Sequence, residues 1–367
     1  MTRDILFPTA LLVTLAALGG YVAALLALPM PWMLGALASS AALVGFLPDA
    51  LPAGYRFPQW FRLPFIAVIG LTIGLQVTRD LLAQLPTLAI SLIGITLFVP
   101  LAQFGNYWLF HRVGGFDRPT AFFAGSPGGL MESLLLGEAN GAKVPQLTLQ
   151  QFLRIIVVIT LVPTAISIWV GEPVGSAAGL SNQMPASELP MLPTLAILAA
   201  VGVVGLLVGL RGHIPAGQLT GPLLAAALLN IAPLPHVAMP AWGLIVAQIV
   251  IGASLGARFH GLSRDMLMRG LGLSILSVGF MLALAGMLIA VIFWLAPLDF
   301  DALLISFAPG GVTEMGLIAI TLHANPAVVA LHHIYRIILT VLLMAGMARR
   351  MGITPPKAPS PPPSPSD

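Results

Sequence analysis

The chain has 367 residues, of which 58% are hydrophobic and 8% are charged, and its formal net charge is +3. Soluble domains carry about 25% charged residues, so the composition excludes a soluble protein and indicates an integral membrane protein. The basic residues are scattered, which argues against nucleic-acid binding, and the absence of cysteine excludes disulfides and thiolate catalysis.

Ten continuous apolar segments are predicted to be transmembrane helices, because about 20 apolar residues suffice to cross a hydrocarbon core of about 30 Å. In chain order they are 8–28, 32–47, 62–78, 84–110, 145–170, 191–210, 215–231, 240–257, 267–296 and 326–347. The first segment could be mistaken for a signal peptide, but its apolar part is too long and no small-residue cleavage site follows. We therefore predict an all-α membrane protein, followed by a disordered Pro/Ser-rich tail over 351–367.

Two further apolar segments, 119–140 and 300–323, are interrupted by "SPGG" and "APGG". Each is either one broken crossing or a re-entrant hairpin. If both are re-entrant, thirteen Lys and Arg residues lie on the cytoplasmic side and only Arg79 lies outside; if both cross, the division is eight to six. The positive-inside rule therefore favours two re-entrant hairpins, cytoplasmic N- and C-termini, and an extracytoplasmic linker over 171–190.

The sequence repeats itself at an offset of 182 residues. The matched pairs are Gly70 and Gly252, Gly74 and Gly256, Pro127 and Pro309, Gly128 and Gly310, Gly129 and Gly311, Glu132 and Glu314, and Arg154 and Arg336. Upstream, "PWMLGAL" resembles "GPLLAAAL" at a different offset. Each copy, 1–170 and 191–350, holds five spans and one broken segment. Because five is odd, the second copy starts on the opposite side of the membrane, so we predict inverted-topology repeats.

The two interrupted segments are candidates for a substrate site. Inverted repeats with broken helices are typical of secondary transporters, in which the two breaks meet near the bilayer midplane. In the first copy, Ser126 is expected to cap a half-helix that starts at Pro127, and its free N–H groups suit an anion. The second copy lacks this serine. The predicted substrate-binding residues are Ser126, Pro127, Gly128, Gly129, Pro309, Gly310 and Gly311. Tight turns at the ends of interfacial loops are the alternative.

Glu132 and Glu314 follow the two breaks by about one helical turn. A carboxylate inside the membrane is costly, so both are candidates for binding a coupling proton or cation. The alternative is a structural ion pair with the arginine of the same copy, Arg154 or Arg336.

Arg154 and Arg336 lie within the spans "QLTLQQFLRIIVVITLV" and "AVVALHHIYRIILTVLL". A guanidinium is always charged and suits a carboxylate or another oxyanion, so direct substrate contact and pairing with a glutamate both stay open. His332 precedes Arg336 by four residues and shares its helix face. With its neighbour His333 it could couple protons, or it could serve only as a hydrogen-bonding group.

The glycine pairs Gly70/Gly74 and Gly252/Gly256 are interpreted as helix-packing motifs. Apart from the adjacent His332 and His333, the histidines form no cluster suited to a metal, and no Walker motif is present. We therefore expect no metal, no cofactor, no catalytic residues and no ATP-driven pumping.

The duplicated "PGGLMES…GEANGA…QQFLRII" and "PGGVTEMGLIAITLHANPAVVALHHIYRII" resemble the AbrB membrane-protein family, which carries a duplicated domain. The resemblance covers roughly 8–347, and the second copy matches more fully because the first has Gln150 in place of His332. This family is distinct from the DNA-binding regulator of the same name. The resemblance implies two labels, regulator of gene expression and ammonia monooxygenase. The sequence itself shows neither a signalling or DNA-binding domain nor a metal site.

We therefore predict a secondary transporter in a bacterial inner membrane, for a small anionic or zwitterionic solute coupled to protons or cations. The rival hypothesis is a membrane-embedded sensor or regulator that binds a ligand without moving it. The expected partners are the lipid bilayer and the solute, with no nucleic acid. The sequence allows a homo-oligomer and leaves the solute, the coupling ion and the direction of transport open.

Overall fold

The computed structural model describes residues 3–52, 54–79, 85–171, 187–212, 216–261, 263–296, 298–322 and 324–353. Over these residues the chain forms fourteen α-helices and no strand, which confirms the all-α prediction. The first half contains α1 (Arg3–Leu25), α2 (Pro31–Phe46), α3 (Gln59–Gly74), α5 (Ala89–Trp108), α6 (Arg118–Ala124), α7 (Leu130–Ala139) and α8 (Val144–Val170). The second half contains α10 (Met191–Arg211), α11 (Gly217–Ile231), α12 (Ala241–Gly256), α13 (Arg264–Leu295), α14 (Phe300–Phe307), α15 (Val312–Thr321) and α16 (Pro326–Arg350). Most of the predicted linker and of the predicted disordered tail lies outside the described residues.

Ten of these helices lie at the ten predicted spans. Seven are long and apolar enough to cross a membrane: Ile5–Leu25, Pro86–Val113, Val144–Trp169, Met191–Arg211, Ala241–Phe259, Asp265–Leu295 and Pro326–Ala348. The other three, Pro31–Phe46, Gln59–Gly74 and Gly217–Ile231, are apolar but shorter. At 1.5 Å per residue, a 16-residue helix is about 24 Å long, less than a hydrocarbon core of about 30 Å. The structure therefore supports a membrane protein with at least seven candidate crossings.

Each interrupted segment folds as a short helix, a bend and a second helix. In the first, α6 starts after Asp117, whose carboxylate accepts a hydrogen bond from the Thr120 N–H at 2.9 Å. Lys143, which follows α7, donates its N–H to the Thr120 hydroxyl at 2.8 Å and places its ammonium 3.5 Å from Asp117. The end of this segment therefore lies beside its start. Such a hairpin is the geometry that a re-entrant segment requires.

The second half-helix of this hairpin starts later than the sequence analysis predicts. It begins at Leu130, and its N-cap is Gly129, which has a left-handed φ of 65° that favours glycine. The Ser126 hydroxyl instead accepts a hydrogen bond from the Gln151 side chain at 2.8 Å. The prediction that Ser126 caps a helix starting at Pro127 is therefore wrong, because the left-handed turn at Gly129 interrupts the helical conformation.

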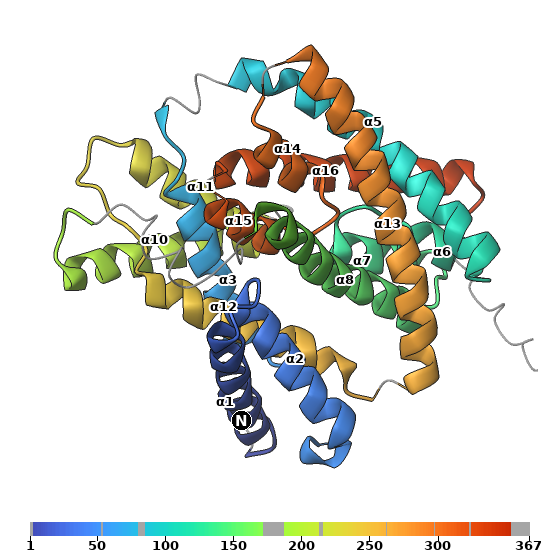
Figure 1. Cartoon of the computed structure of the whole chain (residues 1–367), viewed down its shortest axis with the longest axis horizontal. Coiled ribbons are helices and arrows are strands. Elements are labelled where there is room, and N and C mark those ends of the chain that lie inside the picture. Colours follow the sequence, from blue (N-terminus) through green and yellow to red (C-terminus); the bar gives the residue numbers. More distant parts are fainter. Residues whose placement is uncertain are drawn as a thin grey trace, which may run out of the picture.

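The helices gather into two groups (Figure 1). The six-helix bundle consists of α1, α2, α3, α10, α11 and α12, and the eight-helix bundle consists of α5 to α8 and α13 to α16. Within the six-helix bundle, α2 packs against α12 and α11 packs against α3. The bundles meet where α3 contacts α15 and α16. Each bundle thus contains helices from both halves of the sequence.

The predicted helix-packing glycines lie at the contacts inside the six-helix bundle. A side chain on Gly70 would meet the Leu219 carbonyl of α11, and a side chain on Gly252 would meet the Met33 carbonyl of α2. Since these obstacles are backbone atoms of the facing helix, only glycine permits the observed approach. The packing role predicted for these glycines is confirmed.

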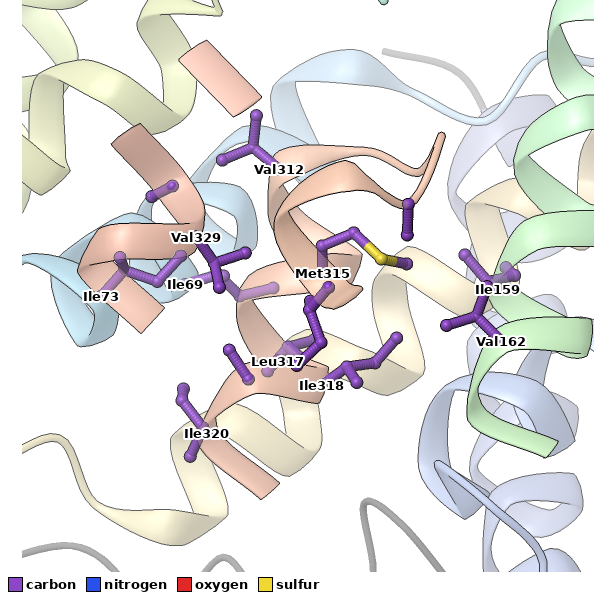
Figure 2. Packing of buried hydrophobic residues seen from close by; sticks show 14 of the residues in the cluster. Ile69, Ile73, Ile159, Val162, Val312, Met315, Leu317, Ile318, Ile320 and Val329 are labelled. Atoms are coloured by element: carbon purple, nitrogen blue, oxygen red, sulfur yellow. The ribbon is translucent and has the colours of Figure 1, made fainter. Parts of the chain in front are cut away.

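Apolar side chains hold α15 in place within the eight-helix bundle and against α3 of the six-helix bundle. Figure 2 shows Met315 and Ile318 of α15 between Ile73 of α3 and Ile159 of α8. Met315, Ile318, Ile73 and Ile159 are all fully buried members of one hydrophobic cluster. Ile73 also packs directly on Gly316, where a larger residue would require the Ile73 side chain to shift. This packing fixes the position of the half-helix that follows the second bend.

Candidate functional site

The two bends line a single cavity. Gly128 and Gly129 of the first bend and Gly310 and Gly311 of the second border a space of about 190 Å³. Residues of α3, α11 and α12 complete its wall, so the cavity lies between the six-helix and the eight-helix bundle. Ser126, Pro127 and Pro309, which the sequence analysis adds to the substrate site, are not among the residues that border it. The glycines of the two bends therefore form the shared surface.

Arg336 is bound to the backbone of the second bend. Its Nη1 donates to the Ala308 carbonyl at 2.6 Å, and its Nη2 donates to the Gly310 carbonyl at 2.7 Å. Only 1% of its side chain is exposed. Because α14 ends at Phe307, the guanidinium satisfies carbonyl groups at a helix C-terminus, where a positive charge is favourable.

Arg154 makes the corresponding contact in the first half. Its Nη1 donates to the Ser126 carbonyl, and Ser126 precedes Arg154 by 28 residues, as Ala308 precedes Arg336. No ion pair joins either arginine to Glu132 or Glu314 among the residues that the structure describes. In this structure each arginine therefore ties down the bend of its own half.

Both arginines also keep one nitrogen free inside the cavity wall. Arg154 and Arg336 border the cavity, are at least 95% buried, and have Nε atoms with no hydrogen-bond partner in the described part of the chain. A side chain on Gly128 would place its first carbon 3.6 Å from the Arg336 Nε, so this arginine of the second half lies against the first bend. A buried, unpaired N–H of a guanidinium is a strong donor for an anionic ligand.

The two glutamates fold back over their own half-helices. Glu132 and Glu314 are each the third residue of their helix, after the N-caps Gly129 and Gly311. A Glu314 carboxylate oxygen occupies the space that a side chain on Gly311 would fill, and a Glu132 oxygen lies 3.2 Å from the equivalent point at Gly129. Both carboxylates border the cavity, and they cover the positive ends of the half-helices. The half-helix N-termini proposed for the substrate are thus occupied by the chain's own carboxylates.

Comparison with known proteins places this architecture in a family. The family model described as "Transition state regulatory protein AbrB" matches residues 50–352. The chain belongs to the AbrB family. It is 26% identical over 356 residues to "Uncharacterized protein YhjN" of Bacillus subtilis (strain 168), with 90% of each chain covered. It is 24% identical over 332 residues to "Putative regulator AbrB" of Escherichia coli (strain K12), covering 86% of this chain and 94% of that protein. The resemblance stated from the sequence is confirmed.

Two arginines of this AbrB-family cavity were missed as site residues. Arg62, at the start of α3, and Arg258, just after α12, both border the cavity. The guanidinium carbon of Arg258 lies 3.6 Å from the ring centre of Phe152, which is a cation–π contact. Sequence reasoning used both arginines only as markers of the cytoplasmic side. The sequence did contain one indication that Arg62 faces the protein interior. Arg62 shares a face of α3 with the packing glycine Gly70, which lies two helical turns further on.

The two adjacent histidines have different surroundings. His332 lies outside the cavity lining, with its Nδ1 2.8 Å from the Val328 carbonyl and its Nε2 2.8 Å from the Ser91 hydroxyl. His333 accepts a hydrogen bond from Arg336 on Nδ1 at 2.6 Å and therefore carries its proton on Nε2, which donates to the Ile305 carbonyl at 3.0 Å. His333 thus orients Arg336 as a neutral ring.

The charged groups of the cavity favour an anion. Four guanidinium groups, Arg62, Arg154, Arg258 and Arg336, and two carboxylates, Glu132 and Glu314, border it. Among the described residues, no group of three or more His, Asp or Glu side chains is placed to hold a metal ion. The chemistry that this lining offers is binding of an oxyanion, with two carboxylates available for protons or cations.

Proposed function

We propose that this AbrB-family protein is a secondary transporter for a small anionic or zwitterionic solute in the bacterial inner membrane. One observation carries the proposal: bends from the two halves of the chain border one cavity that four arginine residues also line. Non-helical backbone at membrane depth is tolerated only where protein buries it or where it lines a cavity. Secondary transporters use this construction to expose a binding site at the bilayer midplane.

Reciprocal contacts between the two halves support the inverted repeats that the proposal requires. The Gln150 side chain of the first half donates to the Ser274 hydroxyl of the second at 2.6 Å. His332, which replaces Gln150 in the second half, contacts the Ser91 hydroxyl of the first. The helix contacts follow the same pattern. In one contact α2 of the first half packs against α12 of the second, and in the other α11 of the second half packs against α3 of the first. The proposed two-fold relation between the halves would account for each pair of contacts.

The proposed mechanism is a movement of one bundle against the other. Arg154 and Arg336 belong to the eight-helix bundle, whereas Arg62 and Arg258 belong to the six-helix bundle, so the two walls of the cavity can separate. In the predicted topology Arg62 and Arg258 lie at cytoplasmic helix ends, and this arrangement corresponds to a cavity near the cytoplasmic side. Opposite displacement of the bundles would present the same residues to the other side.

Glu132 and Glu314 are proposed to carry the coupling protons or cations. Each carboxylate lies against the N-terminus of its half-helix and faces the cavity. An anionic solute that approaches the same N-terminus meets a like charge, which disfavours two ionised groups at that place. Solute binding would therefore favour protonation or cation binding at the glutamate. This would couple movement of the solute to movement of the proton or cation.

Flux measurements on the purified protein in liposomes test the proposal. Accumulation of radiolabelled anionic or zwitterionic solutes, driven by an imposed proton or sodium gradient, is the expected result. Empty liposomes and liposomes that contain heat-denatured protein serve as controls. Binding without flux, across a broad panel of solutes and ions, would reject the transporter proposal.

The same measurement decides the second candidate function. The name of the Escherichia coli relative and the description of the family both refer to regulation. A membrane-embedded sensor would bind its ligand in the cavity and change its contacts with another protein without moving the ligand. Binding without flux is the result that this candidate predicts.

A further inference from the structure

The cavity contains more positive than negative charge. Its four arginines and two glutamates give a net charge of +2, since four positive groups minus two negative groups leaves two. No other charged side chain is among the described residues that border it. Uncompensated charge inside a membrane protein is costly, so such a site is stable when an anion of matching charge occupies it.

The positive groups form two separate poles on opposite walls. Arg154 and Arg336 lie within electrostatic reach of each other on the eight-helix bundle. Arg62 and Arg258 lie within electrostatic reach of each other on the six-helix bundle, and Glu314 lies within electrostatic reach of Arg62. A guanidinium matches the planar geometry of a carboxylate, so each pole suits one carboxylate. A compact anion such as sulfate would be bound at one pole and leave the other uncompensated.

The two glutamates and the net charge of the cavity decide between a zwitterionic and a dianionic solute. Glu132 and Glu314 lie against the positive ends of their half-helices, and Glu314 also lies within electrostatic reach of Arg62, so the net charge of +2 already includes what the two glutamates compensate. A zwitterionic solute has no net charge and would leave the net charge of +2 uncompensated. The net charge of the cavity therefore favours an anion with two negative groups over a zwitterion.

The volume of the cavity limits the size of the solute. A space of about 190 Å³ corresponds to roughly six water molecules at about 30 Å³ each. A short dicarboxylate has a number of non-hydrogen atoms comparable to that number of water molecules.

We propose that the solute of this protein is a small dicarboxylate, with one carboxylate at the Arg154/Arg336 pole and the other at the Arg62/Arg258 pole. The inference rests on the proposed function and narrows its solute from anions and zwitterions in general to dianions with two separated charges.

Binding to the wild-type protein in nanodiscs, measured by isothermal titration calorimetry, tests this assignment. Four probes form a matched series: succinate, butyrate with the same chain length and one carboxylate, 4-aminobutyrate as the zwitterion, and sulfate as the compact dianion. Succinate is expected to bind about tenfold or more tightly than each of the others, because only succinate contacts both poles. Equal affinity of succinate and butyrate, or tightest binding of 4-aminobutyrate or sulfate, would overturn the proposal.

Two variants locate the second pole. Arg62→Gln is expected to bring the ratio of succinate to butyrate affinity close to one, because one carboxylate loses its partner. Arg211→Gln removes an exposed arginine at the end of α10 that does not border the cavity, and it should leave the ratio unchanged. An unchanged ratio in folded Arg62→Gln protein would contradict the assignment. If Arg62→Gln fails to fold, the wild-type series alone decides.

The outcomes separate this inference from the proposed function. A preference for succinate without flux would retain the dianion site and reject transport. Gradient-driven flux of a monoanion or zwitterion, together with no preference for succinate, would retain transport and reject the dicarboxylate.

Discussion

Replacing Arg336 by methionine should destabilise the protein more than the same change at Arg154. Arg336 donates to three buried acceptors, the carbonyls of Ala308 and Gly310 and the Nδ1 of His333. Arg154 donates to one, the carbonyl of Ser126. Methionine fills a similar linear space without polar atoms, so these hydrogen bonds are lost. The Ala308 carbonyl keeps a second donor, the Gly310 N–H at 2.8 Å, whereas the Gly310 carbonyl and the His333 Nδ1 are left without one.

The difference can be estimated from the number of acceptors. Arg336→Met loses three buried hydrogen bonds and Arg154→Met loses one, and each costs about 1 kcal/mol. Arg336→Met should therefore lose about 3 kcal/mol of unfolding free energy and Arg154→Met about 1 kcal/mol. Each variant also removes one buried positive charge. The free energy gained by not burying that charge is common to both variants and cancels in the difference between them. The difference of about 2 kcal/mol reports the hydrogen bonds to the second bend.

Denaturant titration in one detergent, followed by the fluorescence of the six tryptophans, measures both free energies. Size-exclusion chromatography establishes that each variant starts as folded protein. If Arg336→Met is as stable as Arg154→Met, the bonds to Ala308, Gly310 and His333 do not hold the second bend.

Three other variants probe the packing, the first hairpin and the coupling. Gly252→Ala should lose about 1–3 kcal/mol of unfolding free energy, because the new methyl meets the Met33 carbonyl. Gly272→Ala, where no atom lies within 4 Å, should be neutral or stabilising, and equal losses would contradict the packing argument. Asp117→Ala should lose about 1 kcal/mol with the cap of α6, and Asp117→Ser should restore most of it in the same titration. Glu314→Gln in liposomes should abolish accumulation and retain solute exchange and folded protein; loss of folded protein instead would indicate a purely structural role.

Much of the fold could be predicted because membrane insertion imposes a simple pattern. Apolar runs of sufficient length identify the helices, and all ten predicted spans correspond to helices in the structure. The paired interruptions at Gly128/Gly129 and Gly310/Gly311 were recognisable because proline and glycine break a helix in both copies at one spacing. Duplication then suggested that the bends meet, and they border the same cavity.

The contacts of the site depended on tertiary structure and could not be predicted in the same way. The sequence analysis considered a glutamate and a solute as partners for Arg154 and Arg336, whereas the structure gives both arginines backbone carbonyls. A carbonyl acceptor has no signature in a sequence, since every residue carries one. Arg62 and Arg258 were missed for a related reason, because their approach to the cavity depends on how the two bundles meet.

The hydrogen bonds from the two arginines to backbone carbonyls limit which helices can move in the proposed transport cycle. Arg154 is bonded to the first bend and Arg336 to the second, so both bends are held rigidly to helices of the eight-helix bundle. The part of the proposed solute site that lies on this bundle would therefore be preorganised and would not need to form at each turnover. Arg62 and Arg258 approach the site from the other bundle, and only their distance from the bends has to change. Access to the solute would then be controlled by the boundary between the bundles, while the bends themselves keep one shape.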